Sequence, residues 1–144
     1  MAPLQKRALY GLVFGVIWAI ALVVVFIWKG GADAFDEDAE FRIVIDIIWI
    51  LGLVLYLVLF QTLRKPQQLD ERDKSILERS VKAQWLAVIF SQVGWIIALS
   101  ETYRAEGGVP VIFLYLMFIF TLAVSSIAQT AGILIGYWRM DRNG

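Results

Sequence analysis

Residues 111–138, VIFLYLMFIFTLAVSSIAQTAGILIGYW, form an apolar run of 28 residues that contains no charged side chain. A helix needs roughly 20 residues to cross about 30 Å of hydrocarbon. The run is therefore long enough to span a membrane, and it must tilt or extend beyond the bilayer. Three further apolar runs precede it, at residues 8–28, 43–63 and 83–99.

These four runs dominate the composition of the chain. Hydrophobic residues make up 60% of its 144 residues, and the mean hydropathy is +0.71. We therefore predict an all-α integral membrane protein, a four-helix bundle in which residues 1–144 form a single transmembrane domain. The first run is longer than the roughly 7–15 apolar residues of a signal peptide, and we expect it to be a retained helix.

The lysine and arginine residues are distributed unevenly among the loops. Ten of the 13 lie before the first run, in the central loop at residues 64–82 or after the fourth run. Short loops rich in Lys and Arg stay on the cytoplasmic side. Both termini and the central loop are thus predicted to be cytoplasmic. The first outer loop carries an acidic stretch at residues 33–40, which we expect to be a solvated turn.

The chain contains no cysteine and no histidine. Thiol–disulfide exchange needs a cysteine pair, haem needs an axial ligand that is most often histidine, and Ser–His or Cys–His nucleophiles need an imidazole. The sequence also lacks a glycine-rich phosphate loop and a nucleic-acid-binding signature. We expect no catalytic, cofactor-binding or metal site, no enzymatic activity and no nucleic acid partner.

Small residues recur along the first and fourth runs. Gly11, Gly15 and Ala19 follow one another at intervals of four residues, and such stripes let helix backbones approach closely. They predict either packing within the chain or a dimer contact, with packing favoured. Gly132 and Gly136 belong to a second stripe, on a face of the fourth run that also carries Thr121, Ser125 and Gln129.

Polar side chains inside the spans are candidate sites, because an unpaired polar group in lipid is costly. Asp46 is the one acidic residue within a span, and Arg42 stands one helical turn before it, so an interfacial ion pair is favoured over a proton or ion site. Gln84 and Gln92 lie on the third helix, and we expect Gln92 to bond Gln129. We expect the polar residues of the third and fourth helices to form hydrogen bonds between helices, in preference to lining a pore.

The central loop contains a predicted amphipathic helix that leads into the third span. Asp70 is suited to cap its N-terminus, and Ile76, Leu77 and Val81 recur at helical spacing, opposite a charged face. This helix is either a docking surface for a soluble partner or an interfacial helix against headgroups or the base of the bundle. The candidate docking residues are Asp70, Glu71, Arg72, Asp73 and Arg79.

Two stretches of the second half resemble a known family. Asp70-Glu-Arg-Asp-Lys-Ser-Ile resembles the "DERD" signature of small prokaryotic membrane proteins grouped under domain of unknown function 2178, and Ser126-Ile-Ala-Gln-Thr-Ala-Gly-Ile-Leu-Ile-Gly-Tyr-Trp-Arg resembles the way these proteins end. The resemblance covers residues 69–139. Trp138 and the acidic stretch of the first loop do not match the family pattern. It implies four helices in a prokaryotic inner membrane and no assigned activity. Some relatives are encoded near helix-turn-helix regulators, which would suit cytoplasmic docking.

Two functions from different classes follow from these observations. The first is a non-enzymatic membrane protein that acts by binding, as an accessory subunit of a membrane complex or an anchor for a cytoplasmic regulator. The alternative is a small oligomeric transporter or channel. Small multidrug exporters depend on a deep acidic residue in their first helix, and this chain has none there. The expected partners are the lipid bilayer and a membrane protein, a cytoplasmic protein or further copies of the chain.

Overall fold

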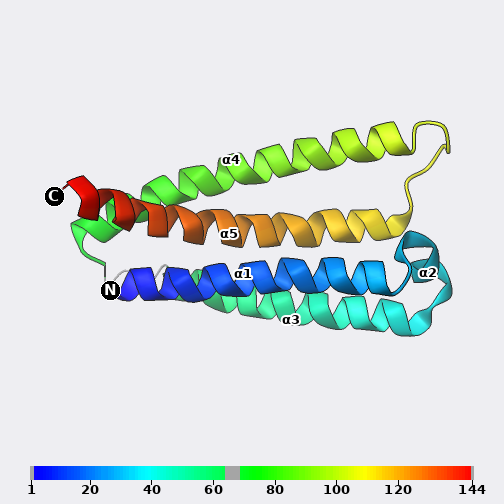
Figure 1. Ribbon diagram of the computed structural model, residues 1–144, viewed down its shortest axis with the longest axis horizontal. Helices are drawn as coiled ribbons and strands as arrows, with labels where there is room; N and C mark the ends of the chain where they lie inside the picture. The colour runs from blue at the N-terminus through cyan, green and yellow to red at the C-terminus, as the bar shows by residue number, and fades with distance from the viewer. Residues whose placement is uncertain (1, 64–68, 144) are drawn as a thin grey trace.

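A computed structural model of the protein describes residues 2–63 and 69–143. The first residues of the central loop, 64–68, lie outside the described part of the chain. Four long helices run along one common direction (Figure 1): α1 (Pro3–Trp28), α3 (Ala39–Leu63), α4 (Glu71–Thr102) and α5 (Val111–Asn143). Each contains a stretch long and apolar enough to cross a membrane. The prediction of an all-helical chain with four long apolar helices is confirmed.

The helices extend beyond the apolar runs because their charged flanks are helical as well. The predicted cytoplasmic helix and the third span form one continuous helix, α4, of 32 residues. Its N-cap is Asp70, as predicted, and the Asp70 carboxylate accepts a hydrogen bond from the Asp73 N–H at 2.6 Å. At about 1.5 Å per residue, α4 and α5 each exceed the thickness of the hydrocarbon layer. Each of them is therefore longer than a perpendicular crossing of a bilayer requires.

Helix α5 is the central element of the structure. It packs against α4 on one side and α1 on the other, and α1 also packs against α3. Both chain ends lie at one end of the molecule, while α2 (Gly31–Glu37) and the loop before α5 lie at the other (Figure 1). Three groups of buried residues follow one another along the helices, centred on Ile133 near the chain ends, on Trp18 in the middle and on Phe41 at the far end.

The acidic stretch at residues 33–40 is mostly helical, with residues 33–37 in α2, so the prediction of a turn is wrong. Gly30 and Gly31 have positive φ and redirect the chain after α1. Helix α2 follows because its Phe35 side chain is buried edge-on against Phe41, with ring centroids 5.6 Å apart. Asp38 then caps α3, and the Phe41 N–H, together with the Glu40 N–H and Lys29, lowers the pKa of its carboxyl.

A glycine in the middle of α3 accommodates the largest buried side chain of α1. The Trp18 ring is 4% exposed, and its Nε1 donates to the Ile48 carbonyl at 3.2 Å. A Cβ added at Gly52 would overlap this ring. The contact between α1 and α3 thus depends on the absence of a side chain at position 52.

We expect Gly52→Ala to lower the free energy of unfolding by about 1–3 kcal/mol, because the indole must move out of a packed site. Gly94→Ala is the matched control on α4, since a Cβ there meets no atom within 4 Å. Alanine is favoured over glycine in a helix by up to about 1 kcal/mol, so the control should be at least as stable as the parent. Unfolding in mixed micelles, followed by circular dichroism, measures both. Equal stability of the two variants would contradict this packing.

Candidate functional site

A polar site inside the apolar region joins three helices. The Gln84 amide of α4 donates to the Ser125 hydroxyl of α5 at 2.6 Å, and both residues are buried. The Tyr56 hydroxyl of α3 lies 3.0 Å from the same Ser125 oxygen. Amides and hydroxyls in an apolar environment need hydrogen-bond partners. We call this Gln84–Ser125–Tyr56 group the polar cluster.

The polar face of α5 that the sequence predicted lies against α4. Thr121, at the end of this face nearer the start of α5, accepts a hydrogen bond from Gln92 of α4. At the end nearer the C-terminus, a Cβ added at Gly132 would lie 3.0 Å from the Ser80 Cβ. The expected bond between Gln92 and Gln129 is wrong, because these residues differ in axial level. Thr121, two helical turns before Gln129, lies level with Gln92 and takes the bond.

Two buried polar atoms next to the polar cluster have no hydrogen-bond partner among the described residues. They are the Ser126 hydroxyl and the Gln129 side-chain nitrogen. Both residues are almost completely enclosed, with exposures of 1% and 2%. A buried donor without a partner costs about 1–3 kcal/mol. Gln129 is therefore held in place by packing and not by its amide N–H groups.

The site can donate and accept hydrogen bonds, but it carries no charged side chain. Its chemical groups are hydroxyls and carboxamides, which neither ionise as acids and bases near neutral pH nor bind divalent cations tightly. Among the residues that the structure describes, no three acidic side chains gather closely enough to hold a metal ion. The polar cluster therefore supplies hydrogen bonds that join α3, α4 and α5.

The first small-residue stripe packs inside the chain. Gly11 and Gly15 are buried, and a Cβ at Gly11 would lie 2.8 Å from the Thr130 methyl group on α5. A Cβ at Gly15 would lie 2.9 Å from Ile127 of the same helix. Ala19 is half-buried. These glycines bring α1 close to α5, which is the intrachain arrangement that the sequence favoured over a dimer contact.

Two of the five candidate docking residues are engaged with the end of α5. Asp73 is buried and accepts a hydrogen bond from the Tyr137 hydroxyl. Arg72 forms an ion pair with Asp141 at 2.9 Å, and its guanidinium lies over the Tyr137 ring. Burial withdraws Asp73 from any docking surface, because this side of α4 faces α5. Asp70, Glu71 and Arg79 are exposed.

Asp46 lies apart from the polar cluster. It is exposed near the start of α3, ten residues before Tyr56. Arg42, its predicted partner, donates to the Phe35 carbonyl at 3.1 Å, and the pairing of Arg42 with Asp46 stays a prediction. The only acidic side chain that the sequence placed within a span is thus not part of the buried polar site.

Tyr56 is the member of the polar cluster that sequence reasoning missed. A tyrosine in the middle of an apolar run could have indicated it, because a buried phenol needs a partner for its hydroxyl. Periodicity along one helix does not say which neighbouring helix supplies that partner.

Comparison of the chain with protein-family models, with characterised proteins and with solved structures found no match. The resemblance of residues 69–139 to a family of unknown function therefore stays a prediction.

Two glutamine-to-leucine variants separate the bonded amide from the unbonded one. Gln84→Leu removes a donor to Ser125, so we expect it to lower the free energy of unfolding by about 1 kcal/mol. Gln129→Leu removes a buried amide nitrogen without a partner and should be neutral or stabilising. Unfolding in mixed micelles measures both changes. The same loss in both variants would show that Gln129 has a partner equivalent to that of Gln84.

Proposed function

We propose that the protein is a non-enzymatic, multi-pass protein of a prokaryotic cytoplasmic membrane that acts by binding. In this proposal it is an accessory subunit of a membrane complex, and α4 contacts an apolar helix of the partner. The excess of Lys and Arg at the termini and in the central loop supports a cytoplasmic location for both ends. That the two termini lie at the same end of the molecule agrees with this orientation (Figure 1).

The observation that carries the proposal is the uncovered state of α4. None of its residues from 85 to 102 is buried, and its main contact in the chain is with α5. Helix α5, in contrast, has buried residues along its whole length, for example Ile112, Ile119 and Ile133. The apolar half of α4 thus has a large surface that no other part of the described chain covers.

The uncovered surface includes a shallow groove suited to another helix. Ser91, Gly94, Trp95 and Ala98 line it, with a volume of about 370 Å³. Three of these four residues are small, and small residues allow close helix approach in a bilayer, where apolar surface alone gives no preference for protein over lipid. The Ser91 hydroxyl adds a hydrogen-bonding group. These features favour a transmembrane partner.

Anchoring of a cytoplasmic regulator receives less support. A regulator would use the charged N-terminal part of α4, but Asp73 is buried there and Arg72 is paired with Asp141. The transporter alternative needs an acidic or otherwise ionisable group at depth. Asp46 is exposed and distant from the polar cluster, and we retain this alternative only as an outcome of the test.

The test is mass spectrometry of intact complexes after purification of the tagged protein in native nanodiscs. We expect a partner protein in fixed stoichiometry, and Ala98→Phe should release it by filling the groove. Val24→Phe is the control, because it adds the same ring on a different helix. Val24 lies on α1 and is 55% exposed. Recovery of a homo-oligomer without another protein would contradict the subunit role. If the homo-oligomer also transports a substrate, and Asp46→Asn abolishes that transport, the transporter alternative would be supported.

A further inference from the structure

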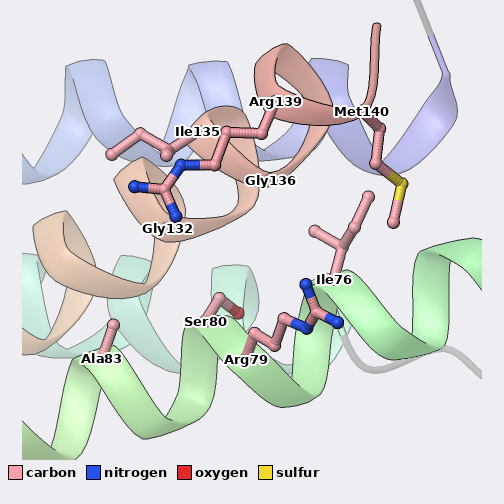
Figure 2. A pocket seen from close by; sticks show the side chains of 9 residues that line it. All are labelled: Ile76, Arg79, Ser80, Ala83, Gly132, Ile135, Gly136, Arg139 and Met140. Atoms are coloured by element: carbon pink, nitrogen blue, oxygen red, sulfur yellow. The ribbon is translucent and has the colours of Figure 1, made fainter. Parts of the chain in front are cut away.

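A second, larger groove lies between α4 and α5 near the ends of the chain (Figure 2). Its volume is about 760 Å³. Ala83, Gly132 and Ile135 line its inner end, while Ile76 and Met140 line its outer end. The groove is open because several of the residues that line it, such as Ala83 and Gly132, have small side chains or none.

Two arginines from facing helices line this groove. Arg79 comes from α4 and Arg139 from α5 (Figure 2). Both are exposed, and neither has an ion-pair partner among the described residues. Arg72 and Arg104, in contrast, are paired with Asp141 and Glu101. Two unpaired guanidinium groups beside one apolar groove create an excess of positive charge that an anion would neutralise.

The level of the groove along the helices corresponds to the surface of a bilayer. Trp85 and Trp138 are 65% and 58% exposed and lie next to the groove in sequence. Exposed tryptophans collect at the headgroup layer of membranes. On α4 the charged segment ends at Lys82 and the apolar segment follows, while on α5 the apolar segment ends at Trp138. Arg79 and Arg139 are thus placed at headgroup depth, with the inner end of the groove toward the hydrocarbon.

We propose that this groove binds one anionic phospholipid. The phosphate lies between Arg79 and Arg139, and an acyl chain follows Ala83 and Ile135 toward the membrane interior. Guanidinium groups bind phosphate through paired hydrogen bonds, and basic pockets between transmembrane helices bind lipid headgroups. This site is distinct from the α4 groove at Ser91–Ala98 and does not depend on a protein partner.

The test is native mass spectrometry of the purified full-length protein in a neutral detergent, titrated with phosphatidylglycerol or phosphatidylcholine. We expect one phosphatidylglycerol to bind in preference to phosphatidylcholine. Arg79→Gln/Arg139→Gln should weaken phosphatidylglycerol binding by about tenfold or more, because it removes the charge-assisted hydrogen bonds from both guanidinium groups to the phosphate. Binding of phosphatidylcholine should not change.

Lys82→Gln/Arg142→Gln is the matched control. It removes the same charge from the same two helices at the same end, but neither residue lines the groove. This variant should keep its phosphatidylglycerol affinity to within about threefold. An equal loss of phosphatidylglycerol affinity in both double variants would overturn the proposed site, because overall charge alone would then explain the binding. An absence of preference for the anionic lipid in the parent protein would also overturn it. Circular dichroism checks that all variants are folded.

Discussion

The close approach of α4 to α5 is the contact on which the other features of the second hairpin depend. Gly132 and Gly136 of α5 leave room for Ser80 and Ile76 of α4, and an added Cβ at Gly132 would lie 3.1 Å from the Ser80 Cα. Lipid surrounds apolar side chains as well as protein does, so helices in a bilayer associate through such close packing and through hydrogen bonds. The contact brings Gln84 to Ser125 and places Arg79 and Arg139 on the two sides of one groove.

The same two helices are held differently along their length. Near the chain ends the contact is formed by glycine and serine, whereas further along it is formed by longer side chains, such as Gln92 with Thr121 and Trp95 with Phe120. Larger side chains separate helix axes, and α4 diverges from α5 toward the loop that joins the two helices (Figure 1). The two proposed binding surfaces follow from this difference: a lipid groove where small residues meet, and a helix-binding face where α4 is uncovered.

The four long helices and the Asp70 cap of α4 could be predicted from the sequence, and the partners in the contacts between helices could not. Apolar runs and Asp70 were sufficient to locate the spans and the start of α4, and spacing along α5 placed Thr121, Ser125 and Gly132 on one face. The sequence did not indicate that Gln92 meets Thr121, because periodicity does not determine the axial level of one helix against another. It also did not reveal the Gly52–Trp18 contact or the membership of Tyr56 in the polar cluster. Both are set by the rotation of α3 around its own axis.

The most direct test of the α4–α5 contact is disulfide trapping in native membranes with Ser80→Cys/Gly132→Cys. The chain has no cysteine of its own, so any bond formed involves the two introduced residues. An added Cβ at position 132 lies 3.0 Å from the Ser80 Cβ, and a small shift reaches the Cβ separation of about 3.8 Å found in disulfides. Mild oxidation should give a bond within one chain in nearly all molecules. Bonds only between chains, or none, would contradict the arrangement of α4 on α5.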